Sequence, residues 1–151
     1  MTTQAREGAT LEQRTQATKY LTASGNFYGG TSNWYKYGFP FINTIYTDGV
    51  KVACDTLGGW WMVNIICSYL DKKYIQWLID KNQFPLFARF TVTKNGGFVF
   101  DLEGYDPENG ETIILKSQKG GFTDLAVNMI HFKIGYNGNG LDYVICMPQE
   151  D

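Results

Sequence analysis

The hydrophobic periodicity of the chain changes at Pro85, and this change limits the folds open to it. Before Pro85, apolar residues recur at helical spacing in several segments, and proline prevents further helix because it lacks an amide hydrogen. From Phe87 onward, apolar and polar residues alternate, as they do in half-buried β-strands. Helices followed by strands are typical of an α+β fold, so we predict N-terminal helices packed on a C-terminal antiparallel sheet of about four to five strands.

The expected helices have recognisable starts and stops. Thr10 and Gln13 stand at capping-box spacing, in which each side chain bonds the backbone amide of the other residue. Asp48 is a suitable N-cap residue, and Gly58 and Gly59 would end the helix that it begins. The predicted helices span residues 10–21, 48–57, 60–70 and 71–82, of which the third is apolar nearly all round and therefore central to the core.

Turn residues separate the expected strands. Asn95 and Gly96 form a strong hairpin signal, and residues 104–110 and 137–140 are rich in Gly, Asn and Asp. The predicted strands of the C-terminal sheet span residues 87–93, 98–102, 112–116, 129–136 and 141–147, with a further short strand at 42–46.

An aromatic, glycine-rich segment separates the first helix from the rest. Residues 22–44 show neither a helical nor a strand period, so we predict an ordered but irregular loop. Seven aromatic residues lie between Phe27 and Phe41, and Trp and Tyr dominate interaction hot spots. Because loops run over the surface, we expect these rings to face another molecule. The candidate binding residues are Tyr28, Trp34, Tyr35, Tyr37 and Phe39, together with Trp60 and Trp61.

Length and charge bound the organisation and the partners. The chain has 151 residues and a net charge of −2, and we expect a flexible tail over residues 1–9 and a single domain over 10–151. Binding nucleic acid independently of sequence requires many phosphate contacts, and the Lys and Arg residues are too scattered to supply them. The polar start and the lack of a long apolar stretch indicate a cytoplasmic protein without membrane contact.

Few residues are suited to metal binding. Cys54, Cys67 and Cys146 have apolar neighbours and no Cys-x-x-Cys spacing, and His131 is the only histidine. A zinc site of the usual composition therefore has no ligand set, and we expect neither metal nor cofactor. The odd number of cysteines fits a reducing compartment, in which they would serve as small buried hydrophobes.

The residues that are suited to catalysis have simpler structural explanations. His131 alternates with Ile130 and Phe132, so we expect it on the solvent face of a strand. Helix capping accounts for Asp48. We therefore expect no enzymatic activity, and a hydrolase is the least favoured function. Its carboxylates would be Asp48 or the acidic residues that we expect in a solvated turn, Asp101, Glu103, Asp106, Glu108 and Glu111.

Four parts of the chain carry a resemblance to a known family. They are residues 30–37, 46–51, 58–64, and 122–124 with 147–150, and the most specific is Tyr46-Thr47-Asp48-Gly49-Val50. The chain resembles an uncharacterised family, a domain of unknown function, of small proteins carried by phages, plasmids and other bacterial mobile elements. Asn64 stands where that family is expected to have an acidic residue, and residues 71–85 look like an insertion. The resemblance implies an α+β fold and a mobile-element accessory gene, and it supplies no catalytic residues.

Together these observations favour a non-enzymatic binding protein. We expect an accessory factor of a phage or other mobile element that contacts a host or phage protein in the bacterial cytoplasm, with a homo-oligomer as its expected assembly. An inhibitor of a host defence system is one instance of this class, suggested by the gene setting that the resemblance implies. The alternative is a small-molecule, nucleotide-like ligand stacked in an aromatic pocket between the 22–44 segment and Trp60 and Trp61.

Overall fold

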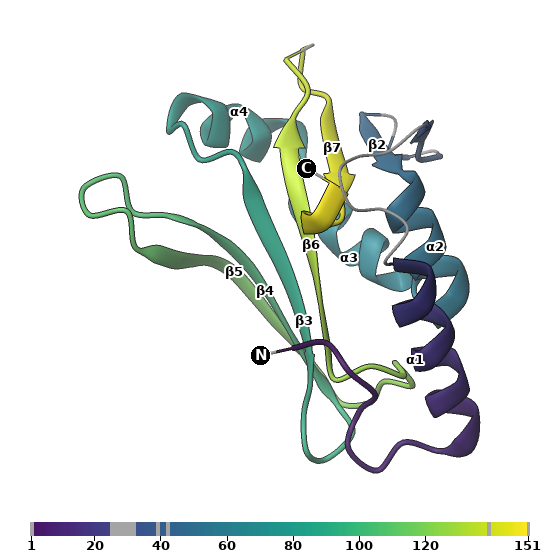
Figure 1. The fold of residues 1–151 in the computed structure, drawn as a ribbon. Helices are drawn as coiled ribbons and strands as arrows, with labels where there is room; N and C mark the ends of the chain where they lie inside the picture. Colours follow the sequence, from purple (N-terminus) through teal and green to yellow (C-terminus); the bar gives the residue numbers. More distant parts are fainter. Residues whose placement is uncertain (1, 25–32, 39, 42, 139, 151) are drawn as a thin grey trace.

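Seven strands form one mixed sheet, and the helices precede most of them along the chain (Figure 1). The computed structural model describes residues 2–24, 33–38, 40–41, 43–138 and 140–150. Within these residues the strand order is β1-β2-β7-β6-β3-β4-β5, and all neighbours are antiparallel except β2 and β7, which are parallel. The expected α+β class is confirmed.

The elements have the following bounds. The helices are α1 (Leu11–Ser24), α2 (Asp48–Leu57), α3 (Trp60–Tyr69) and α4 (Lys72–Asp80), and a 3₁₀ helix, η2 (Pro148–Glu150), follows the last strand. The strands are β1 (Trp34–Lys36), β2 (Thr44–Thr47), β3 (Leu86–Val92), β4 (Phe98–Tyr105), β5 (Thr112–Gly120), β6 (Met129–Tyr136) and β7 (Tyr143–Cys146).

The sheet is larger than the expected four to five strands because two N-terminal segments join it. Strand β2 pairs with β7, and β1 pairs with β2 at the edge of the sheet. Strand β1 lies inside residues 22–44, so the prediction of an irregular loop is wrong for residues 34–36. A strand of three residues shows too little alternation to be detected from its sequence. The structure also extends β5 to Gly120, beyond the expected end at residue 116.

Predicted local signals explain several element ends. In the capping box, the Thr10 amide donates to Gln13 Oε1 at 2.9 Å, and the Gln13 amide donates to Thr10 Oγ1 at 3.1 Å. Helix α2 ends at Gly58, whose φ of 63° lies in the left-handed region that glycine adopts without steric cost. The capping box and this glycine stop are both confirmed.

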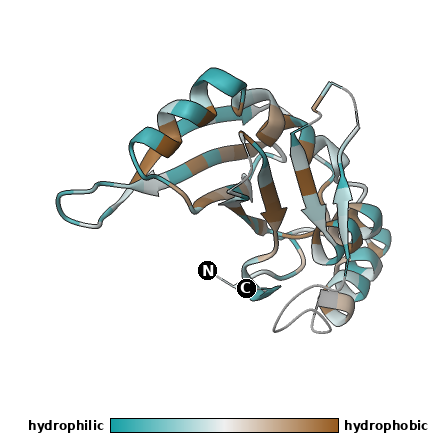
Figure 2. Ribbon diagram, turned by 90° about the horizontal axis from the view of Figure 1, so that it is seen from above, coloured by the Kyte–Doolittle hydropathy of each residue, from teal (hydrophilic) through white to brown (hydrophobic). Residues whose placement is uncertain are grey.

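Helices α3 and α4 cover one face of the sheet, and the core lies between these helices and the sheet (Figure 2). Trp61 of α3 packs on Phe90 and Phe98, with ring centroids 5.6 and 4.9 Å apart, and Tyr69 stacks on Phe100. Helix α2 packs against the β2–β7 end of the sheet and α1 packs on α2 (Figure 1). The opposite face of the sheet carries the polar residues of the alternation and η2.

The N-terminal segment pairs with the chain near β6. Ala5 forms an isolated bridge with Val127, and the Arg6 amide donates to Ala126 O at 3.0 Å. The Arg6 guanidinium also donates to Thr123 O at 2.7 Å. The segment that we expected to be a flexible tail, residues 1–9, therefore has specific backbone and side-chain contacts in its described part.

Two of the three cysteines are buried core residues, as expected, whereas Cys146 is less buried than expected. Cys54 and Cys67 are buried, Cys146 is half-buried, and all three are free thiols. Burial raises the pKa of the Cys54 thiol to about 12, so this group stays protonated and unreactive near neutral pH. No helix in the described part of the chain is both long and apolar enough to cross a membrane.

Candidate functional site

Five aromatic rings form one continuous cluster at the β1 edge of the sheet. Tyr35 stacks on Tyr46 with ring centroids 5.2 Å apart, and Tyr46 meets the edge of Trp60 at 5.1 Å. Tyr37 stacks on Trp60 at 5.9 Å and on Phe41 at 6.0 Å. The cluster joins β1, β2 and the first residue of α3, because the antiparallel register places Tyr35 opposite Tyr46. We call these residues, Tyr35, Tyr37, Phe41, Tyr46 and Trp60, the aromatic cluster.

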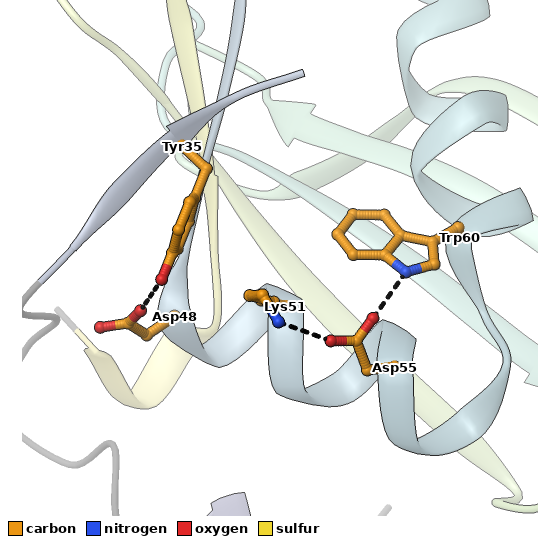
Figure 3. A network of polar contacts seen from close by, with 5 residues as sticks. All are labelled: Tyr35, Asp48, Lys51, Asp55 and Trp60. Carbon is orange, nitrogen blue, oxygen red and sulfur yellow. Dashed lines mark hydrogen bonds and ion pairs between the residues drawn. The ribbon is translucent and has the colours of Figure 1, made fainter. Parts of the chain in front are cut away.

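Polar groups on α2 fix two rings of the cluster, those of Tyr35 and Trp60 (Figure 3). The Tyr35 hydroxyl donates to Asp48 Oδ1 at 2.9 Å, and this hydrogen bond raises the pKa of Tyr35. The Trp60 indole donates to Asp55 Oδ1 at 2.9 Å, and Lys51 forms an ion pair with Asp55 Oδ2 at 2.8 Å. The Lys51 and Trp60 hydrogen bonds lower the pKa of Asp55. The rings are therefore held in defined orientations rather than free to rotate.

A further contact fixes Tyr37. Its hydroxyl donates to Asn64 Oδ1, on the exposed side of α3, at 2.6 Å. An amide oxygen serves this purpose without adding a charge beside the rings. Burial of the ring raises the pKa of Tyr37, so its hydroxyl stays protonated and able to donate near neutral pH.

Asp48 anchors β1 instead of capping α2, so its predicted role is wrong. The N-cap of α2 is Thr47, and Asp48 is the first helical residue. The Asp48 carboxylate accepts hydrogen bonds from the Asn33 amide at 3.0 Å, from Asn33 Nδ2 at 3.2 Å and from the Tyr35 hydroxyl. This carboxylate is turned toward β1 because another acidic side chain occupies the helix N-terminus.

The carboxylate at the N-terminus of α2 is that of Glu150, about 100 positions away in sequence. Glu150 is buried, and its Oε1 accepts from Thr47 Oγ1 at 2.6 Å and from the Met147 amide at 2.7 Å. Its Oε2 accepts from the Gly49 amide at 3.1 Å. A Cβ on Gly49 would lie 2.5 Å from Glu150 Oε1, so only glycine admits the carboxylate. The Tyr-Thr-Asp-Gly-Val signature and the Met-Pro-Gln-Glu segment thus meet in space.

The candidate binding residues fall into separate groups. Trp34 lies on β1 with 61% of its surface exposed and alternates with Tyr35, which belongs to the aromatic cluster. Trp60 also belongs to that cluster, but Trp61 packs on the sheet core against Phe90 and Phe98. The two adjacent tryptophans therefore do not line a common pocket. Tyr28 and Phe39 lie outside the described residues.

The only histidine is less exposed than its position in a strand indicated. His131 is half-buried, and the Arg89 guanidinium donates from Nε to His131 Nε2 at 2.8 Å. Arg89 Nε also lies 3.4 Å from Glu103 Oε1, so Arg89 forms an ion pair with Glu103. Burial and the neighbouring Arg89 lower the pKa of His131, which keeps the imidazole neutral and able to accept. His131 lies on the polar face of β6, as its alternation with Ile130 and Phe132 predicts, but Arg89 on the adjacent strand partly covers the ring.

The acidic residues near the β4–β5 turn also lie in different surroundings. Glu103 points into a pocket of about 270 Å³ on the open face of the sheet, where its side chain is only 13% exposed. Asp101 accepts from Ser117, and Asp106 accepts from the Glu108 amide within the turn. The exposed turn that we expected is present for Glu108 and Glu111, but Glu103 belongs to the Arg89–His131 group. The expected solvated turn is wrong for Glu103, which lies in β4 beside Arg89, because cross-strand register is not visible in one sequence.

Comparison with known families decides where the chain belongs. Residues 15–151 match a family of unknown function, DUF6876. The chain belongs to the DUF6876 family. The match includes the aromatic cluster, Asp48 and both halves of the Glu150 contact, whereas the bridge at Ala5 precedes it. Neither the curated proteins nor the solved structures include a match to this member of DUF6876.

Proposed function

We propose that this protein is a non-enzymatic binding protein that holds a protein partner along the outer edge of β1. The observation that carries the proposal is Trp34, a large aromatic residue with 61% of its surface exposed on an edge strand. Tryptophan is among the residues most enriched in interface hot spots. Natural proteins usually protect edge strands, so an exposed Trp there favours a binding role.

The backbone of β1 supports this proposal. Tyr35 and Tyr46 are register partners, and the Tyr37 amide donates to Thr44 O at 2.8 Å. The backbone amide and carbonyl groups of Tyr35 and Tyr37 therefore face β2. In an antiparallel ladder the intervening residues direct their amide and carbonyl groups away from that partner. The backbone groups of Trp34 and Lys36 are therefore available to an added strand at the outer edge of the described sheet, which is the geometry of β-augmentation.

The edge is also rigid before binding. Asp48 holds both Asn33 and Tyr35, and the aromatic cluster packs one face of β1 against β2 and α3. A partner strand that pairs with a preformed edge loses less conformational entropy than one that must order a loop. This favours specific binding despite the short length of β1.

The partner class follows from the resemblance to mobile-element proteins. We propose that the protein is an accessory factor of a phage or other mobile element and that its partner is a host or phage protein in the bacterial cytoplasm. An inhibitor of a host defence system is one function of this kind. Binding without catalysis agrees with carboxylates such as Asp48 being used for structural hydrogen bonds.

The test is affinity capture from a bacterial lysate, followed by the same capture with two β1 variants. Trp34→Ala removes the exposed ring, and Lys36→Pro removes one outward amide, which an edge strand tolerates. Both variants should lose the captured protein, whereas Trp77→Ala, an exposed tryptophan on α4, should retain it. A partner that binds both β1 variants as well as the unmodified protein would refute the proposal.

A second copy of the chain is the competing occupant of this edge. Two β1 strands related by a two-fold axis would pair antiparallel through the same outward groups. Light scattering on the purified protein distinguishes the two cases. A dimer that Lys36→Pro converts to a monomer would show that the edge serves self-association and would overturn the assignment of a different protein partner.

A further inference from the structure

A pocket that is independent of β1 and of the proposed function lies between α4 and β5. It is a pocket of about 420 Å³, within the range of small-molecule sites. It is far along the sheet from β1, because β1 and β5 are the two edges of the seven-strand order. The lining residues are Ser68, Tyr69, Asp71, Lys73, Tyr74, Trp77 and Lys116.

A flat aromatic platform forms one wall of this pocket. Tyr74 and Trp77 are three positions apart on α4, and their rings stack with centroids 5.5 Å apart and an interplanar angle of 7°. Trp77 is 43% exposed, whereas Tyr74 is half-buried. An exposed ring supported from below by a second ring is suited to stack on a planar ligand. Aromatic side chains bind nucleobases in this way with little dependence on the base.

Two ammonium groups border the platform. Lys116 Nζ lies 4.8 Å from the centroid of the Tyr74 ring, and Lys73 lines the same pocket. In the described part of the chain the ion pairs are Lys51–Asp55 and Arg89–Glu103, so neither of these lysines has a carboxylate partner there. The one acidic residue of the wall, Asp71, already accepts from the Tyr74 amide as the cap of α4. The pocket therefore has a net positive charge beside a stacking surface.

We propose that this pocket binds a mononucleotide, with the base stacked on Trp77 and the phosphate held by Lys73 and Lys116. A planar ring next to an anion is the combination that these side chains complement. A single nucleotide fits better than a strand, because the chain has a net charge of −2 and a strand would require a series of phosphate contacts. This is a different site from the nucleotide-like pocket expected between residues 22–44 and Trp60 and Trp61, because α4 and β5 line it.

Isothermal titration calorimetry with AMP and UMP, at low and moderate salt, tests the proposal. Both nucleotides should bind, and adenosine or inorganic phosphate alone should bind at least tenfold more weakly than AMP. Trp77→Ala should weaken AMP binding at least tenfold, whereas Trp77→Phe keeps a stacking ring and should retain most of it. Lys116→Gln should weaken binding and reduce its salt dependence, because one phosphate contact is lost.

The matched control is Trp34→Ala, which removes an exposed tryptophan at the opposite edge of the sheet and should leave AMP binding unchanged. Circular dichroism establishes that each variant is folded. Absence of AMP and UMP binding at millimolar concentration, or unchanged AMP binding by folded Trp77→Ala, would overturn the proposal. Much tighter binding of a ten-nucleotide single strand than of AMP would overturn the assignment of a mononucleotide. Neither result bears on partner capture through β1, so the two proposals fail separately.

Discussion

The buried carboxylate of Glu150 provides the sharpest test of how the fold is held together. Replacing Glu150 with Gln keeps the shape of the side chain but removes its charge and converts one acceptor oxygen into a donor. If the amide oxygen takes the place of Oε1, the Thr47 and Met147 hydrogen bonds remain. The Gly49 amide, which now donates to Oε2 at 3.1 Å, would then face another donor.

The expected cost follows from these contacts. A buried donor left without an acceptor costs about 1–3 kcal/mol. Loss of a negative charge from the N-terminus of α2 adds about 0.3–1 kcal/mol. We therefore expect Glu150→Gln to lower the free energy of unfolding by roughly 1–4 kcal/mol, which lowers Tm by about 3–16 °C in a protein of this size.

Urea denaturation followed by circular dichroism measures this free energy, with Glu12→Gln as the control. Glu12 is exposed in the first turn of α1, so losing its charge should cost less than about 0.5 kcal/mol. Gly49→Ala should already displace the carboxylate, and Glu150→Gln should then cost much less in that background. An effect of Glu150→Gln no larger than that of Glu12→Gln, or full additivity with Gly49→Ala, would refute the reasoning.

Two further perturbations test contacts elsewhere in the chain. Because burial and Arg89 lower the pKa of His131 below its ordinary 6.5, the unfolded chain takes up a proton first as the pH falls. Stability should therefore decrease as the pH falls from about 6.5 toward the folded-state pKa, and His131→Gln should flatten unfolding curves measured across that window. Thr10→Ala removes one half of the capping box and should cost about 1 kcal/mol in the same denaturation assay, with an unchanged value contradicting a capping role.

Most of the secondary structure is predictable from local signals along the chain. The capping box at Thr10, the glycine stop at Gly58 and the alternation after Pro85 each depend on residues only a few positions apart. Such signals are visible in one sequence because their physical cause is local. Strand β1 was missed for the converse reason. Its three residues are stabilised by pairing with β2 and by Asp48, which are tertiary contacts.

The candidate site divides in the same way. The exposure of Trp34 was predicted from the aromatic segment in which it lies. The role of Asp48 was not predicted, because an acidic residue beside a helix start is normally its cap. The role of Glu150 was not predicted either, because its partners are distant in sequence. The adjacency of Asp48 and Gly49 was visible, yet the reason for the glycine is a side chain about 100 positions away. Likewise, the contact between Arg89 and His131 was not predicted, because it depends on the register that places these two residues opposite each other.

The geometry gives the segment Thr47-Asp48-Gly49 a physical role that bears on the proposed function. Thr47 and Gly49 receive Glu150 at the start of α2, and this frees Asp48 to hold Asn33 and Tyr35. One short segment therefore fixes the C-terminal end of the chain on one side and the edge strand on the other. A structural role alone accounts for the Glu150 contact, because it holds the C-terminal segment against the start of α2. The second contact, that of Asp48, orders a three-residue edge strand whose outer backbone groups and exposed Trp34 add little to the core. The binding edge that we propose accounts for this arrangement, because a partner strand needs an edge that is already ordered.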